Sequence, residues 1–210
     1  RLRAKDSPVA SHAQDIATGL GFGEIDVYVS TRQPYAMVAE PTSPVSLVIG
    51  QAIAQQEPKA IRFAAGSALK LAQSSLAIPA RLPAEELGVL VVSLMRVFQP
   101  DWAHGVVGLD ADAIVAQTQK LRRLIPTGLS NELKPFALAV DAQQFHHADL
   151  ARDLRVAGLR AGLVASGSLL AGLGILAAAA ERDVPSFLAD PVAQGLITWV
   201  LSEDHASVTR

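Results

Sequence analysis

The side chains with the clearest metal-binding chemistry are those of His146-His147-Ala148-Asp149, followed by Asp153. On a helix, His146, Asp149 and Asp153 are spaced i, i+3 and i+7 and share one face. Imidazole and carboxylate groups at this spacing suit a divalent metal, so His146, His147 and Asp149 are the candidate metal or acid–base site of a hydrolase. The same pattern is typical of a solvated polar face, which is the interpretation we favour.

Ser67 is the candidate nucleophile within an otherwise apolar segment. A nucleophile elbow needs Gly-x-Ser-x-Gly between a strand and a helix, whereas Ser67 follows Ala65-Gly66 and precedes Ala68-Leu69 and has no neighbouring base. We therefore expect a small residue that permits close helix packing. The chain contains no cysteine, which excludes disulfides, thiolate zinc sites and a cysteine nucleophile.

The bulk composition indicates one aliphatic core and little electrostatic attraction to polyanions. Of 210 residues, 50% are hydrophobic and 5% aromatic, and 18 basic residues stand against 20 acidic ones, for a net charge of −2. This balance argues against nucleic acid or an anionic membrane surface as a partner. Residues 161–180 carry no charge, but 13 of these 20 are Ala, Gly or Ser, which favours a buried helix pair over a membrane span.

The pattern of elements predicts strands near the start and helices afterwards. Ser7-Pro8 opens a first helix, which ends at the glycines between 19 and 23. Three strands are then predicted, over 24–30, 35–40 and 45–50, and their short proline-containing links favour an antiparallel meander. Only helices are predicted from residue 51 onward. Residues 1–7 are interpreted as a linker and 8–205 as a single domain.

The order of these elements resembles that of the Ste24/HtpX-type zinc metallopeptidases. The likeness rests on a strand reading VYVS, two further strands, and a helix that includes Ile61-Arg62-Phe63-Ala64-Ala65-Gly66. It covers residues 9–76 and, more loosely, 148–180. In that family, two histidines at i and i+4 of this helix and a glutamate from a later helix hold zinc, and a glutamate beside the first histidine activates water.

The resemblance places unsuitable residues at every one of these positions. Ser67 and Leu71 stand at the two histidine positions and Ala68 at the glutamate, and none of them can do that chemistry. Arg155 stands where the third ligand belongs, and Leu159 replaces an aspartate of the same motif. The resemblance therefore implies a zincin-like domain without its metal site, with no catalytic residue and no cofactor.

We expect an α+β domain, mostly helical, with a small three-stranded antiparallel sheet near the N-terminus followed by packed helices. The favoured function is that of a pseudopeptidase: a non-catalytic protein-interaction or scaffold domain in a bacterial, cytoplasmic, multidomain protein. The chain begins with Arg1 rather than Met, which fits a fragment of a larger protein. Its partner would be another protein or another domain of the same chain, and a small-molecule ligand is left open. The alternative is the hydrolase at His146, His147 and Asp149, and an unrelated α-rich domain remains the alternative to the zincin-like fold.

Overall fold

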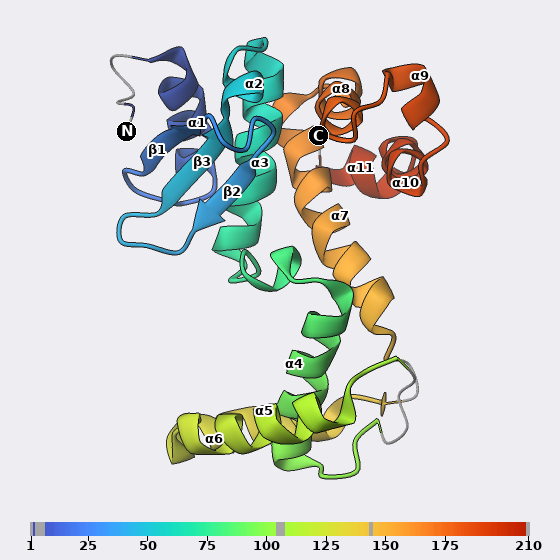
Figure 1. The fold of residues 1–210 in the computed structure, drawn as a ribbon. Helices are drawn as coiled ribbons and strands as arrows, with labels where there is room; N and C mark the ends of the chain where they lie inside the picture. Colours follow the sequence, from blue (N-terminus) through green and yellow to red (C-terminus); the bar gives the residue numbers. More distant parts are fainter. Residues whose placement is uncertain (1, 3–6, 104–107, 143–144, 209–210) are drawn as a thin grey trace. The chain divides into compact units, whose positions relative to one another are not determined.

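The computed structural model describes residues 2, 7–103, 108–142 and 145–208 (Figure 1). His104 and most of the predicted linker over 1–7 lie outside the described residues. The chain forms two compact units, one of residues 1–80 and 154–210 and the other of residues 81–153. A single domain was predicted over 8–205. This stretch is divided between the two units, each of which has its own buried side chains.

The first unit begins with the predicted helix and the three predicted strands. Pro8 occupies the first turn of the first helix, where its missing N–H costs nothing. After this helix, Gly21 adopts a φ of +82°, a conformation that a glycine accepts without strain. The elements of this part are α1 (Pro8–Gly19), β1 (Asp26–Ser30), β2 (Met37–Glu40), β3 (Ser46–Gly50) and the short α2 (Gln51–Ala54).

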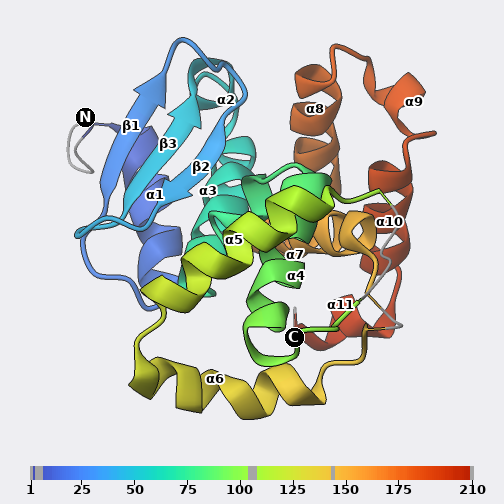
Figure 2. The same cartoon turned by 60° about the horizontal axis from the view of Figure 1, so that its bottom comes forward.

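The sheet is mixed, so the predicted antiparallel meander is wrong. The strand order is β1-β3-β2, with β1 parallel to β3 and β2 antiparallel to it (Figure 2). The most apolar strand, β3, takes the central place, and its Leu47 and Ile49 are fully buried. The prediction failed because the link after β1 does not turn back beside β1, but passes over the end of β3 and leads into β2 on the far side.

Gly50 allows this passage over the end of β3. Its N–H donates to Ala36 O at 2.9 Å, and the N–H of Ala52 donates to Pro34 O at 3.0 Å. A Cβ at position 50 would collide with the backbone carbonyl of Pro34. Glycine is therefore required by the close approach of two backbones rather than by an unusual φ, which is −65° here.

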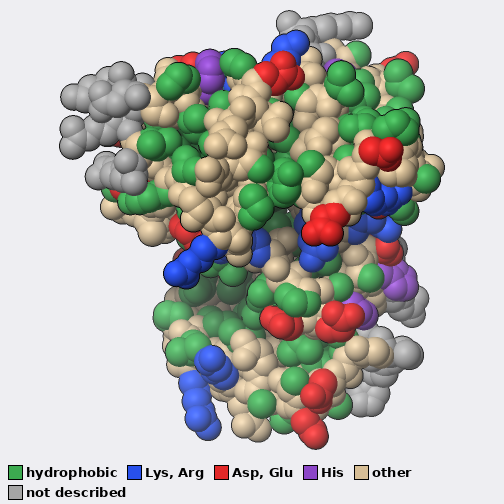
Figure 3. Space-filling view, turned by 45° about the horizontal axis from the view of Figure 1, so that its top comes forward, with side chains coloured by type: hydrophobic (Ala, Val, Ile, Leu, Met, Phe, Trp, Pro, Cys, Tyr) green, Lys and Arg blue, Asp and Glu red, His purple; other side chains and the backbone are tan. Residues whose placement is uncertain are grey.

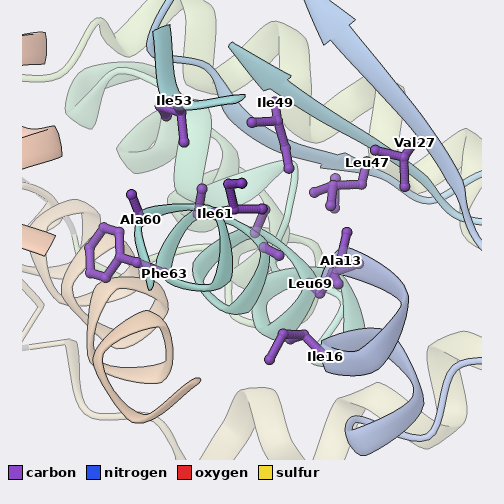
Figure 4. Close-up of a cluster of buried hydrophobic side chains, with 14 of the residues drawn as sticks. Ala13, Ile16, Val27, Leu47, Ile49, Ile53, Ala60, Ile61, Phe63 and Leu69 are labelled. Carbon is purple, nitrogen blue, oxygen red and sulfur yellow. The ribbon is translucent and has the colours of Figure 1, made fainter. Parts of the chain in front are cut away.

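The helix α3 (Pro58–Gln73) is the centre of the first unit. It packs against β2 and β3 on one side, against α1 on another and against α8 (Leu169–Ala179) on a third. Figure 4 shows the side chains that surround it, with Phe63 pointing away from the sheet towards another helix. Phe63 is fully buried, which contributes about 2–3 kcal/mol of apolar transfer free energy. The sheet and α1 supply Ala13, Ile16, Val27, Leu47 and Ile49 to this cluster.

The charge-free stretch 161–180 forms two helices, as predicted. The helix α7 (His147–Ser166) ends at a turn in which Gly167 has a φ of +60°, and Ser168 then caps α8 by accepting from Ala171 N. None of the helices that the structure describes combines the length and the apolar character needed to cross a membrane. The remaining helices of this unit are α9 (Val184–Phe187), α10 (Pro191–Val200) and α11 (Glu203–Val208).

The second unit is a small helical assembly with a separate core. Asp110 caps α5 (Ala111–Leu124), because its carboxylate accepts from the N–H groups of Asp112 and Ala113. Trp102 is buried at the core, and its indole N–H donates to Val140 O at 3.0 Å. The unit contains α4 (Ala84–Phe98), α5 (Ala111–Leu124), α6 (Thr127–Ala139) and the first residues of α7.

Replacing Gly50 by alanine should destabilise the first unit, because the new Cβ would meet the Pro34 carbonyl and displace the link between β1 and β2. We expect a loss of about 3 kcal/mol in urea unfolding. The matched control is Gly23→Ala, since nothing lies within 4 Å of a Cβ there, and its effect should stay within about 0.5 kcal/mol. Equal stability of the two variants would show that the link does not cross β3 as described.

Candidate functional site

The candidate site is built on α3 because this helix is buried on nearly all sides. Pro58 fits its first turn, and from Ala60 to Leu69 every side chain except Arg62 is buried. Arg62 and Lys70 are two turns apart and therefore lie on the same side of the helix, with Gly66 between them. This charged side also borders α7, because a Cβ on Gly66 would lie 2.5 Å from Ala165 Cβ and Arg62 Nε donates to Ala165 O.

The predicted histidine positions face α7 at close range. A Cβ on Gly158 would lie 2.8 Å from a methyl group of Leu71, and one on Gly162 would collide with Ser67 Oγ and lie 2.6 Å from Phe63 O. The two helices thus run antiparallel, with glycines of α7 directly against the residues of α3 where zinc ligands would stand. The backbone of α7 therefore lies directly against these two positions of α3.

Ser67 contributes a hydroxyl group without a function in this arrangement. Its side chain is 4% exposed, and Ser67 Oγ has no hydrogen-bond partner among the described residues. An unsatisfied buried hydroxyl costs about 1–3 kcal/mol, which the burial of neighbouring Phe63 offsets. Ala68 is buried in the main core.

The position predicted for the third zinc ligand does not lie beside Ser67. Arg155 is exposed, and its Nε donates to Ala80 O at 3.3 Å. It precedes Gly162, the residue that faces Ser67, by seven positions, or about 10 Å along the helix axis. Leu159 packs at the edge of the main core. The structure therefore brings Ser67 and Leu71 against α7, but against its glycines rather than against Arg155 or Leu159.

The histidine–aspartate cluster does not form a metal site in the described part of the chain. No group of three or more metal-ligating side chains was found there. Asp149 and Asp153 both pair with Arg152, at 2.9 Å and 3.3 Å, so their carboxylates already have a cationic partner. His146 is exposed, whereas His147 packs at Gly88. His146 precedes the first residue of α7, so it does not share a helix face with Asp149 and Asp153.

An open groove of about 530 Å³ lies on the charged side of α3, in the first unit. Three cations line it: Arg62 and Lys70 from α3 and Arg160 from α7. Asp15 of α1 is the carboxylate among its lining residues. The groove's apolar surface comes from Ile16, Leu20, Ala161, Val164, Ala165 and Trp199.

Each of the three cations is held by an uncharged neighbour. Arg62 Nε donates to Ala165 O at 3.2 Å, and Lys70 Nζ donates to Gln73 Oε1 at 2.7 Å. The Arg160 guanidinium lies over the Trp199 ring, 5.5 Å from its centroid, a contact worth about 0.5–1 kcal/mol at an exposed site. None of the ion pairs between described residues involves these three cations. Their charges are therefore available to a ligand.

The chain as a whole carries no excess of positive charge. Figure 3 shows one face of the molecule, on which acidic and basic side chains of the described residues are interspersed. The net charge of −2 agrees with this picture. Any electrostatic attraction at the groove is therefore local and confined to the ligand groups that enter it.

Sequence reasoning missed this groove. Arg62 and Lys70, two turns apart in an otherwise apolar helix, mark its charged side, and that signal was present in the sequence. The positions of Arg160 and Trp199 were not predictable, because they depend on where α7 and α10 pack against α3. The groove is thus formed from segments that are distant in the chain, namely residues 15–20, 62–70, 160–165 and 199–208.

Replacing Ser67 by alanine should leave the fold intact and raise its stability by about 1 kcal/mol, because it removes an unsatisfied buried hydroxyl from a helix. The matched control is Ser166→Ala in α7. Ser166 is also buried, but its hydroxyl donates to Leu163 O and accepts from Ser168 N, so its loss should cost about 1 kcal/mol. Thermal unfolding followed by circular dichroism measures both. If both variants lose stability equally, Ser67 has a partner that the structure does not show.

Comparison with known proteins adds no relative. No protein-family model matches the chain, and the searches of curated proteins and of solved structures return no match either. The resemblance to zinc metallopeptidases therefore rests on the order of the elements and on the residues quoted for it. The function has to be inferred from the chain's own contacts and charges.

Proposed function

We propose that this chain is a non-catalytic protein-interaction or scaffold domain with a metallopeptidase-like arrangement of elements, acting as a module of a larger bacterial protein. The observation that carries the proposal is the close packing of α7 against α3. Gly158 and Gly162 place the backbone of α7 against Leu71 and Ser67, where an active relative would hold its metal and admit a substrate.

Two further features support the same proposal. The helix α3 packs against β2, which is an edge strand of the sheet, and against α7 on another side. The positions corresponding to ligands and general base carry Ser67, Leu71, Ala68 and Arg155, none of which suits zinc hydrolysis. A domain with this framework and without these groups acts on other molecules by binding them at its surface.

The edge of β2 is one surface where an extended segment of a partner could add. Ala36 O accepts from Gly50 N, and the alternation of an antiparallel ladder then directs the N–H and C=O groups of Met37 and Ala39 away from β3. Two residues of outward-facing backbone offer a short strand for pairing. This surface is too brief to give strong binding alone, so side-chain recognition elsewhere has to contribute.

The proposal predicts that the purified protein neither holds zinc nor hydrolyses peptides. After incubation with excess zinc chloride and gel filtration, mass spectrometry of the metal content should find zinc far below one atom per chain. A fluorogenic casein substrate should remain intact at enzyme concentrations at which an active zinc peptidase digests it.

Stoichiometric zinc together with peptide hydrolysis would overturn this proposal. The double variant His146→Ala with His147→Ala then locates the activity. Loss of zinc and hydrolysis in that variant would establish the alternative, a relocated hydrolytic site. Retention of both would place the metal elsewhere in the chain.

A further inference from the structure

We infer that the groove lined by Arg62, Lys70 and Arg160 binds an acidic amphipathic segment of a partner protein, with aliphatic side chains on the groove floor and carboxylates at its rim. This inference rests on the proposed interaction function and names the chemistry of the partner. It follows from the positions of the three cations and from the apolar surface between them.

The cations do not converge on one point. Arg62 and Lys70 are eight residues apart on α3, a separation of about 12 Å along the axis. Their hydrogen bonds hold them apart: Arg62 Nε bonds to Ala165 O at the end of α7, and Lys70 Nζ bonds to Gln73 farther along α3. A single carboxylate or phosphate therefore cannot pair with both cations, whereas a ligand with several separated carboxylates can.

A peptide provides carboxylates at this separation in a simple way. In a helix, acidic residues seven apart are about 10 Å apart, and in an extended chain residues four apart are about 13 Å apart. The groove volume of about 530 Å³ is within the range that accepts a few side chains. A fatty acid has one charged end and leaves two of the cations unpaired.

The floor of the groove distinguishes a peptide from a nucleic acid. Apolar side chains and the Trp199 ring lie between the cations, so the ligand has to present aliphatic groups there. Three cations are also fewer than the phosphate contacts that give a nucleic acid substantial affinity, and the chain is acidic overall. Leu- and Glu-rich segments meet both the charge and the apolar requirement.

The test uses a fluorescein-labelled peptide of sequence EALLEALEALLE and the intact chain, with binding measured by fluorescence anisotropy. The control peptide EASSEASEASSE carries the same charges without the leucines. We expect saturable one-to-one binding of the first peptide, at least tenfold weaker binding of the second, and a loss of affinity as salt is raised.

Charge variants decide whether this groove is the site. Lys70→Glu and Arg160→Glu alter exposed residues and should each weaken binding about five-fold, whereas Asp15→Asn should strengthen it about two-fold by removing a repulsive carboxylate. The matched control is Lys59→Glu, on the same helix but not among the residues that line the groove, which should bind normally. Circular dichroism verifies that each variant is folded.

Several outcomes would overturn the inference. These are no binding up to millimolar peptide, equal binding of the serine peptide, or equal weakening by Lys59→Glu. Displacement of the peptide by equimolar dodecanoate would assign the groove to a small amphiphile, and displacement by an oligothymidylate would assign it to single-stranded nucleic acid. None of these results affects the zinc and hydrolysis measurements, so failure of this inference is distinguishable from failure of the proposed function.

Discussion

Close packing between α3 and α7 is the constraint on which the first unit depends. Two glycines, Gly158 and Gly162, remove the side chains that would otherwise separate the helices, so the backbone of α7 lies directly against Ser67 and Leu71. Interiors of proteins are packed as densely as organic crystals, and this contact meets that density only because glycines stand at both positions of α7.

The same packing creates the charged groove. Because the sheet, α1, α7 and α8 surround α3, the charged residues Arg62 and Lys70 are confined to the one side that remains open. Arg160 of α7 joins them there because it lies near Gly158 and Gly162 on the helix that packs closest. The surface proposed for binding is thus a consequence of the contact between α3 and α7.

The sheet shows where local patterns were sufficient and where they were not. All three strands were predicted close to their observed places, since alternation and proline turns are local signals. Their order was predicted incorrectly, because it depends on Gly50 meeting the carbonyl of Pro34 after the chain has crossed β3. Nothing in the link itself distinguishes a hairpin from a crossing over the neighbouring strand. The crossing is favoured because it places β3 at the centre of the sheet, where Leu47 and Ile49 are buried.

The sequence by itself determined which chemistry the residues could supply and where the first helix and the three strands lie. Serine, alanine and leucine at positions 67, 68 and 71 supply no imidazole, thiolate or carboxylate there in any fold, and Asp110 caps α5 through its own neighbours. Only the tertiary structure decided the strand order, the alignment of α3 with the glycines of α7, and the grouping of Arg62, Lys70, Arg160 and Trp199 around one groove. Capping and side-chain chemistry act over a few residues, whereas these arrangements depend on burying apolar surface between segments about a hundred residues apart.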